Sequence, residues 1–553
     1  MIAEQTARWE VDATLRKRGF RHVGPNPDRY RGSLRIGHTT AEVEIDIPDL
    51  EFVELPKIRF VDRSSVSLPI IAHLEEGTGL CYADRSLLRL DRFRPGASIL
   101  RVLREAEATI AKSLAGGALL EVATEYPSYW GGSNVLVMFG RSTTARTARL
   151  AVPNSLNSST QLLLVNDKQH IPAGFQTGRS AITVHASTDI GAGTNILVPK
   201  TLGQLREWYE EQSGFSVPSF GEIGNALSDG QVLFIAARNG WVGCQIELPT
   251  DLKLLAKRGA RREFLRGEIR KRETNIGLIR YHGSEASLDD ITSRNLNGMA
   301  TSLKGKSIAV VGCGTIGSHL ARYLVQSGAG NDARLFLVDR ELLAAGNLGR
   351  HLLNFADIGE SKAEALATEL SRFHPDVRIK ALAIDVKDVW NRLRGCDLVV
   401  DATGVEAVSD YLNQRALEAR SLGQSAFLLH TWLFGNGIAA QSFLNVGDGF
   451  ACYRCLRPDL GKPWLNDPRK DVKDVGRIAA TSCGDGPYLP FSVAAPAMAA
   501  GLGLQAILDF FDGKPGARLR TIALDLEEAR KLNEKSPKPH EQCPACGAGT
   551  GAR

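Results

Sequence analysis

The chain has little net charge and no long run of charge of one sign. Its 67 lysine and arginine residues nearly balance 62 aspartate and glutamate residues, so the formal net charge is only +5 over 553 residues. Proteins that bind nucleic acid usually concentrate basic residues in one stretch or on one face. The charge therefore gives no reason to expect nucleic acid as a partner, and a protein or a small anion fits equally well.

The N-terminal residues lack the apolar core of an export signal. Glu4, Arg8 and Glu10 bring charges to the place where a signal peptide needs an uninterrupted hydrophobic stretch. We therefore expect a cytoplasmic protein. In that compartment the nine cysteines should stay reduced, which excludes a disulfide framework.

Long hydrophobic runs are also scarce. Only residues 492–511 approach the length of a membrane span, and this segment is rich in alanine and glycine and contains Pro496, Gln505 and Asp509. The pattern favours a buried helix of a water-soluble domain. No membrane partner is expected.

A single compact core cannot hold 553 residues, and three parts can be distinguished. Residues 1–118 contain a leading helix, alternating apolar and polar positions typical of strands, and a helix over 98–114. Residues 119–280 combine short strands, turns and two helical stretches without a chemical motif, and we interpret them as a mixed α/β linker or docking domain. Residues 281–553 alternate strands and helices, which predicts an α/β domain with a doubly wound parallel sheet.

Residues 308–322 form a predicted strand, loop and helix that carry glycines at the spacing of a nucleotide-binding loop. At Gly312, Gly314 and Gly317 the backbone can approach a phosphate and offer amides at a helix N-terminus. Asp339 ends the next predicted strand, where an acidic side chain can bind ribose hydroxyls. These residues predict a nucleotide site, with NAD and ATP both open.

Four of the cysteines form two Cys-x-x-Cys pairs, Cys452 with Cys455 and Cys543 with Cys546. Each pair has the spacing of a zinc knuckle. Four thiolates complete the tetrahedral coordination of zinc and leave no open position, as a structural site requires. We therefore predict a structural Zn²⁺ that braces the nucleotide-binding domain. Reduced surface thiols are the alternative.

Three further segments decide between the nucleotides: the Asn-Leu-x-Arg element that ends at Arg350, the Gly-x-x-Lys element that ends at Lys362, and the strand end at Asp401. In order and spacing they resemble the adenylation domain of the ubiquitin-activating, ThiF-type superfamily over about residues 308–546. The resemblance implies ATP with Mg²⁺. Arg350 and Lys362 would contact phosphates, Asn347 would position the nucleotide, and Asp401 would help to hold the metal.

The resemblance is incomplete at one position and points to one further cysteine. Many relatives carry an acidic or amide residue where this chain has Gly404, so contacts to a substrate tail there cannot be carried over. In activating enzymes that form thioesters, a cysteine downstream of the adenylation residues takes the acyl group. Cys483, in the polar loop 480–486, is the candidate for this role. An incidental or buried cysteine is the alternative.

Residues 1–118 resemble the ubiquitin-conjugating fold, with a leading helix, a strand meander, a stretch that contains His73, then Cys81 and a second helix. The resemblance implies that Cys81 is the conjugating cysteine. The His-Pro-Asn of eukaryotic relatives is absent because Leu74 follows His73, so the asparagine's part in oxyanion stabilisation cannot be carried over. His73 and Asp84 are candidates to assist the thiol, and structural roles for His73 and Cys81 stay open.

Together the three parts resemble the fused conjugating-activating proteins of bacterial antiphage (CBASS-type) operons. The resemblance implies adenylation of a partner's C-terminal carboxylate, thioesters on Cys483 and then Cys81, and conjugation to an amine such as that of lysine. The partner would be a cGAS-like nucleotidyltransferase or a ubiquitin-like protein, and a homodimer is expected. Alternatives are a sulfur-carrier-type adenylyltransferase whose N-terminal domains only dock partners, and a non-catalytic nucleotide sensor. An NAD-dependent redox enzyme ranks last.

Overall fold

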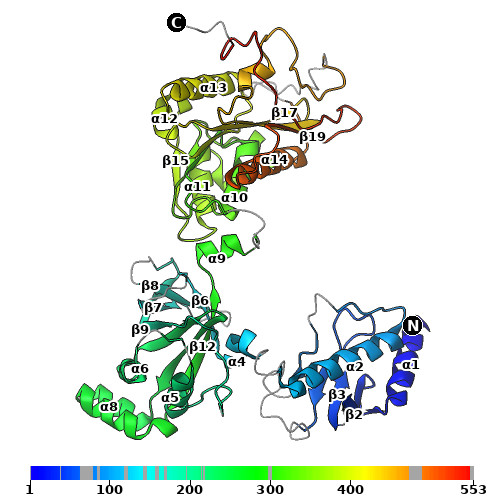
Figure 1. Ribbon diagram of the computed structural model, residues 1–553, viewed down its shortest axis with the longest axis vertical. Coiled ribbons are helices and arrows are strands. Elements are labelled where there is room, and N and C mark those ends of the chain that lie inside the picture. The colour runs from blue at the N-terminus through cyan, green and yellow to red at the C-terminus, as the bar shows by residue number, and fades with distance from the viewer. Residues whose placement is uncertain are drawn as a thin grey trace. The chain divides into compact units, whose positions relative to one another are not determined.

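The structure is a computed structural model in which the chain forms two compact units, Met1–Ala286 and Ser287–Arg553. Strands of these units build three separate sheets (Figure 1). The structure describes residues 2–37, 39–62, 79–83, 88–117, 122–140, 146–155, 161–166, 171–194, 196–212, 214–215, 218–294, 296, 302–472 and 489–547.

The first sheet is an antiparallel meander associated with two helices. Its five strands are adjacent in the order of the chain: β1 (Arg21–His22), β2 (Arg29–Ile36), β3 (Thr39–Asp46), β4 (Lys57–Phe60) and β5 (Gly79–Leu80). Helices α1 (Ile2–Lys17) and α2 (Pro95–Lys112) pack against each other, and α2 also packs on β2. Alternate side chains of β3 are buried because successive side chains of a strand point to opposite faces. The predicted helix over 98–114 is present as α2 and a following π-helical turn, Ser113–Gly117.

The second sheet closes into a barrel of seven strands, which the sequence did not predict. In spatial order the strands are β10 (Val232–Ala237), β11 (Gly240–Glu247), β12 (Gly277–Glu285), β6 (Ser133–Val137), β8 (Leu162–Asn166), β7 (Arg146–Pro153) and β9 (Phe175–His185). The helices of this part are α4 (Tyr126–Trp130), α5 (Leu202–Glu211), α6 (Phe220–Ser228), α7 (Thr250–Lys257) and α8 (Arg262–Lys271).

The domain boundary predicted at residue 280 falls inside a strand of this barrel. β12 pairs with β11 on one side and with β6 on the other, through Glu285. Cutting at residue 280 would divide one hydrogen-bonded strand, so the barrel extends to residue 285. The partners of β12 are far away in sequence, and composition does not reveal them.

The third sheet has seven strands and is doubly wound, as predicted. In spatial order they are β15 (Ile379–Leu382), β14 (Leu335–Val338), β13 (Ile308–Val311), β16 (Leu398–Asp401), β17 (Leu428–Phe434), β18 (Ala439–Asn445) and β19 (Leu519–Ala523). The first five are parallel, and β18 and β19 are antiparallel. The central strands β13, β14 and β16 are buried at every position, as expected for strands covered on both faces.

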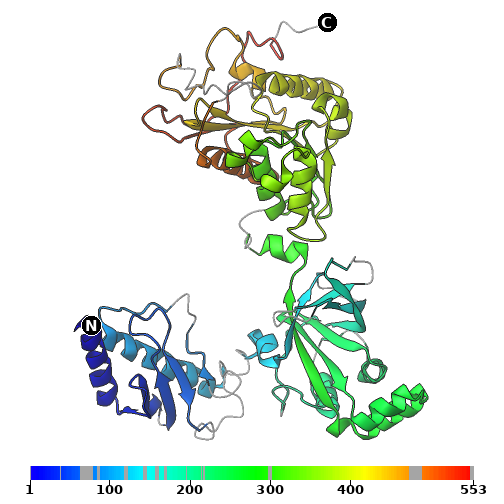
Figure 2. The same cartoon turned by 180° about the vertical axis from the view of Figure 1, so that it is seen from behind.

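Helices cover both faces of the third sheet. On one face lie α10 (Thr315–Gln326), α11 (Lys362–Ser371) and α14 (Ala494–Phe511), and on the other lie α12 (Val386–Leu393) and α13 (Glu406–Ser421). Figures 1 and 2 show α13 and α14 on opposite sides of the strands. The short helix α9 (Leu288–Ser293) precedes this domain in the chain.

Helix α14 corresponds to the one long apolar segment of the sequence. Among the described residues it is a helix that could cross a membrane by length and composition. Its small residues Ala499, Ala500 and Gly503 instead pack on β17 and β18, and α14 also contacts α10. The predicted buried helix is therefore confirmed.

Candidate functional site

A cavity of about 570 Å³ lies at the carboxyl ends of the central parallel strands. Strand β13 has β14 on one side and β16 on the other, so the chain adds strands on one side of β13 and then on the other, with all of these strands parallel. Open α/β sheets bind ligands at this switch point, in sites of roughly 300 to 1,000 Å³. The ends of all three strands contribute to the lining, at Val311, Val338 and the residue after β16, Ala402.

The predicted glycine loop forms one wall of this cavity. Gly312 and Gly314 line it. Gly312 has a φ of 88°, and a Cβ there would lie 2.8 Å from the Cα of Thr403. Gly317, in the first turn of α10, has no room for a Cβ because it would collide with the carbonyl oxygen of Gly312. Two of the glycines are thus required by the backbone, and the third leaves open space beside the cavity.

Replacing Gly317 by alanine is expected to weaken nucleotide binding at least about 10-fold, since overpacking here must displace the loop. Isothermal titration of the full chain with ATP measures the effect. Gly501→Ala is the matched control, because Gly501 lies in helix α14 with no atom within 4 Å of an added Cβ. Equal affinities of the two variants would contradict this role of the loop.

Asp339, directly after β14, lines the cavity and contacts the glycine loop. Its carboxylate accepts hydrogen bonds from the backbone amides of Cys313, at 2.7 Å, and Glu341, at 2.8 Å. Burial raises the pKa of Asp339, although these amides and Lys362 act to lower it. The predicted ribose-binding carboxylate therefore lines the cavity and also fixes the loop.

Lys362 is a buried cation that lines the same cavity. Its side chain is only 7% exposed, and Nζ lies 2.6 Å from Oε2 of Glu341, whose side chain is 65% exposed. A buried charge needs a partner, but this partner is largely in water and can turn away. Lys362 is thus placed to exchange the Glu341 carboxylate for a phosphate oxygen.

Asn347 and Arg350 do not line the cavity. Both belong to the 3₁₀ turn Ala345–Arg350, where Oδ1 of Asn347 accepts a hydrogen bond from the Ala344 amide at 3.0 Å. The guanidinium of Arg350 lies 5.2 Å from the ring centre of Phe491, and Phe491 does line the cavity. Arg350 therefore lies against a cavity-lining ring without lining the cavity itself, and its phosphate contact stays a prediction.

Asp401 does not line the cavity either, and its role as a magnesium ligand stays a prediction. Its side chain is 2% exposed, and both oxygens accept hydrogen bonds from the protein. Ser409 donates to Oδ2 at 2.5 Å, and Nδ1 of His430 lies 2.9 Å from the same oxygen. The amide and hydroxyl of Thr403 bond to Oδ1. No free oxygen of Asp401 faces the cavity.

The position of Asp401 gives it a structural role. Burial alone would raise the pKa of its carboxyl, but hydrogen bonds from His430, Ser409 and Thr403 outweigh burial and lower the pKa. The hydroxyl of Thr403 in turn accepts a hydrogen bond from the Val405 amide at 3.2 Å, and Thr403 and Val405 line the cavity. Asp401 is thus a buried anion that shapes the cavity loop. The sequence did not reveal His430 and Ser409 as its partners, because only the register of β16 with β17 and the orientation of α13 bring them to Asp401.

The four knuckle cysteines come together, as predicted. Their sulfur atoms all lie within 4.8 Å of one another. Cys452 lies 3.7 Å from Cys455 and 3.7 Å from Cys543, and Cys455 lies 3.3 Å from Cys546. A tetrahedron with Zn–S bonds of about 2.3 Å has sulfur atoms about 3.8 Å apart. The donor set therefore fits a structural zinc ion.

The surroundings of the cysteine cluster also suit a cation. Hydrogen bonding to Cys455 and Cys543, together with burial, raises the pKa of the Cys452 thiol, so four thiolates would not share this space without a positive charge. The backbone amide of His540 donates to Sγ of Cys455 at 3.3 Å. Such donors commonly support metal-bound ligands.

The predicted conjugating cysteine, Cys81, is accessible. Cys81 follows β5 directly, and its side chain is exposed. Its neighbours in the chain are fixed, because Leu80 is buried and the hydroxyl of Tyr82 donates to the Pro56 carbonyl at 2.7 Å. His73, Asp84 and Cys483 lie outside the described residues.

Two protein families match separate parts of the chain. The prokaryotic E2 family B matches residues 6–139, and the ThiF family matches residues 290–545. Over 98% of both chains the protein is 29% identical to the ATP-dependent ubiquitin transferase-like protein Cap2 of Pseudomonas aeruginosa. It is 30% identical to Cap2 of Escherichia coli over 49% of this chain and 45% of that protein.

Among solved structures, the E. coli MccB crystal structure with MccA aligns with 53% of this chain and 84% of that chain. The TM-score is 0.35 at 19% sequence identity, which is too low to support an inference. The sequence relatives and the two family matches characterise the two regions of the chain without this structural likeness. Over nearly its whole length the chain is therefore similar to a ubiquitin transferase-like protein, with a match to the prokaryotic E2 family B followed by a match to the ThiF family.

Proposed function

We propose that this protein activates the C-terminal carboxylate of a partner protein with ATP and passes it through two cysteines to an amine. The observation that carries the proposal is the buried cation of Lys362 at a nucleotide-sized cavity, on a chain that also exposes Cys81 beside a strand meander. The first feature suits adenylation and the second suits acyl transfer. Neither feature alone would imply both adenylation and acyl transfer.

In the adenylation step a carboxylate oxygen of the partner attacks the α-phosphorus of ATP. The bond between that phosphorus and the bridging oxygen of the β-phosphate breaks, and pyrophosphate leaves. Negative charge builds up on the phosphate oxygens, and the Lys362 ammonium and the amides of the glycine loop are placed to offset it. Arg350 can join them once its guanidinium leaves Phe491.

The acyl group then moves by thioester exchange. The Cys483 thiolate attacks the acyl carbon and AMP leaves, and the Cys81 thiolate attacks the same carbon and releases Cys483. Finally an amine attacks, an amide forms, Cys81 leaves as a thiolate, and the amine proton passes to solvent. Fusing both regions on one chain raises the effective concentration of the second thiol. His73 and Asp84 are the candidates to assist this last step.

The finer assignments follow from the family resemblance. ATP with its usual Mg²⁺ is the proposed cofactor, and a structural Zn²⁺ occupies the cysteine cluster. The activated tail belongs to a cGAS-like nucleotidyltransferase or a ubiquitin-like protein, and the acceptor is a protein amine, in a cytoplasmic antiphage pathway. We propose a homodimer as the working assembly.

The relay is tested by non-reducing electrophoresis with ATP, magnesium and a candidate partner. Cys81→Ala is expected to leave ATP–pyrophosphate exchange unchanged and to retain a reducible adduct on Cys483, while conjugates fall at least about 100-fold. Cys483→Ala should remove both adducts and still allow exchange.

Cys244→Ala is the matched control, because Cys244 is a fully buried cysteine of the barrel. Adducts that persist in both Cys81→Ala and Cys483→Ala would contradict the proposed thioester relay. Unchanged chemistry in Cys81→Ala alone would favour a sulfur-carrier-type adenylyltransferase. Exchange absent with every partner would favour a nucleotide sensor.

A further inference from the structure

Helix α13 uses two neighbouring faces for two different purposes. Ala407, Val408 and Tyr411 line the nucleotide cavity. Polar side chains at positions 406, 410 and 413 follow the spacing of a second helical face. One helix therefore connects the cavity with the segment that contacts its second face.

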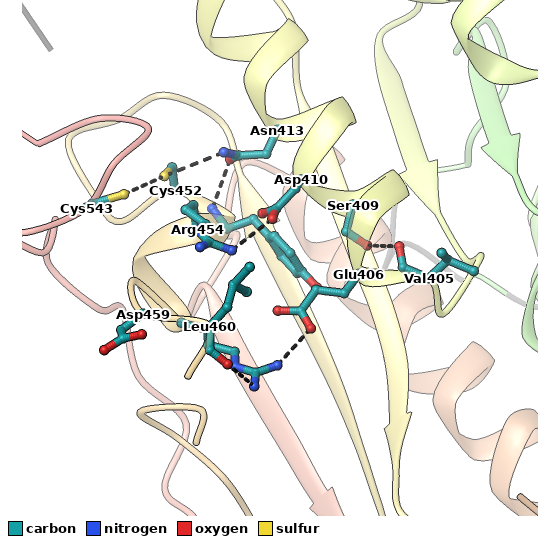
Figure 3. Close-up of polar contacts among 12 residues, drawn as sticks. Val405, Glu406, Ser409, Asp410, Asn413, Cys452, Arg454, Asp459, Leu460 and Cys543 are labelled. Atoms are coloured by element: carbon teal, nitrogen blue, oxygen red, sulfur yellow. Dashed lines mark hydrogen bonds and ion pairs between the residues drawn. The ribbon is translucent and has the colours of Figure 1, made fainter. Parts of the chain in front are cut away.

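The second face is held by the segment that carries Cys452 and Cys455. Nη1 of Arg454 lies 2.9 Å from Oδ2 of Asp410 (Figure 3). Nη1 of Arg457 lies 2.8 Å from Oε2 of Glu406. Arg457 also donates to the carbonyls of Leu460, at 2.7 Å, and Lys462, at 2.9 Å. The backbone thus orients its guanidinium toward the helix.

Asn413 joins the helix to the cysteine cluster directly. Its Oδ1 accepts a hydrogen bond from the Tyr453 amide at 3.0 Å, and its Nδ2 lies 3.7 Å from Sγ of Cys452. Asn413 is 1% exposed, so these bonds are shielded from water. The helix and a cluster cysteine therefore cannot move independently without breaking buried hydrogen bonds.

On its sheet side the same helix is fastened to the cavity loop. The Ser409 hydroxyl donates to Asp401, the buried anion that orders Thr403 and Val405. A shift of α13 would therefore move cavity-lining side chains and strain the loop before them. The helix therefore connects the cysteine cluster to the nucleotide cavity, so that a displacement of one would shift the other.

The arginine pairs are too exposed to contribute much to stability. The side chains of Arg454 and Asp410 are 13% and 30% exposed, and those of Arg457 and Glu406 are 25% and 34% exposed. Such partly solvated pairs usually contribute little to unfolding. Their geometry nevertheless fixes the helix at its cavity end. We propose that Arg454 and Arg457 are positioning residues through which the cysteine cluster sets the shape of the nucleotide cavity.

This inference rests on the proposed ATP site, and the test uses the full chain. The double variant Arg454→Gln/Arg457→Gln is expected to raise the Kd and KM for ATP about 5-fold with kcat of pyrophosphate exchange unchanged. Zinc content and Tm should stay at wild-type values. The double Arg→Lys variant keeps both charges and should recover much of the affinity.

Arg372→Gln serves as the matched control, since Arg372 forms a comparable 2.7 Å pair with Glu369 at the end of α11, outside the cavity lining. Wild-type ATP affinity in the double Gln variant would overturn the inference while leaving the proposed function intact. Loss of zinc or a lower Tm in parallel with affinity would show a structural role only and would also overturn it. If the wild type itself binds no ATP in the same titration, the proposed function fails and this inference falls with it.

Discussion

Replacing Lys362 by methionine is expected to lower the rate of ATP–pyrophosphate exchange at least about 100-fold, or about 2.7 kcal/mol of transition-state stabilisation. Lys362 is the most deeply buried of the cations that line the cavity, since Arg340 and Lys387 are 69% and 64% exposed. Methionine keeps most of the length and the apolar stem of lysine and removes the charged ammonium group. Because Glu341 is largely solvated, its loss of a partner costs little.

Lys387→Met is the control for this experiment. Lys387 also lines the cavity, but its ammonium lies 3.9 Å from Asp385 and water screens it. Its replacement should change exchange less than about 5-fold. Equal losses in both variants would mean that the overall charge of the cavity matters and the buried position of Lys362 does not.

Features that depend on local sterics or on simple chemistry were predictable from the sequence. Gly312 and Gly317 were recognisable because a left-handed φ and a close approach of helix to strand exclude other residues. The four cluster cysteines were recognisable because tetrahedral zinc needs four ligands at knuckle spacing. In the glycine loop, and within each cysteine pair, the physical requirement is written within a few residues.

Features that depend on long-range pairing were not predictable. Asp401 meets His430 because β16 and β17 are in register, and it meets Ser409 because of the phase of α13. The same limit applies to the barrel, whose closure depends on β12 pairing with β6 and on β10 pairing with β9. A family resemblance supplied a role for Asp401, but only the packing showed where its oxygens point.

Replacing Cys543 and Cys546 by serine together is expected to abolish zinc binding and to destabilise the C-terminal unit by at least about 4 kcal/mol, or about 10 °C in Tm. The physical reason is that little regular secondary structure supports the last described segment. Residues 524–547, after β19, contain no helix or strand, and the isolated bridges Arg469 to Ala529 and Leu519 to Lys535 are their regular pairings. The cluster ties this segment to the buried turn at Tyr453–Leu456.

The measurements for this pair of substitutions are zinc content by mass spectrometry, thermal unfolding and limited proteolysis within residues 524–547. Cys396→Ser is the matched control, because Cys396 is a buried cysteine of the same unit that lies outside the cluster. It should keep one zinc per chain and most of the stability. A serine pair that unfolds at the wild-type temperature would mean that the polypeptide alone holds this segment. Arg454 and Arg457 would then act on helix α13 from an anchor that the polypeptide holds without zinc.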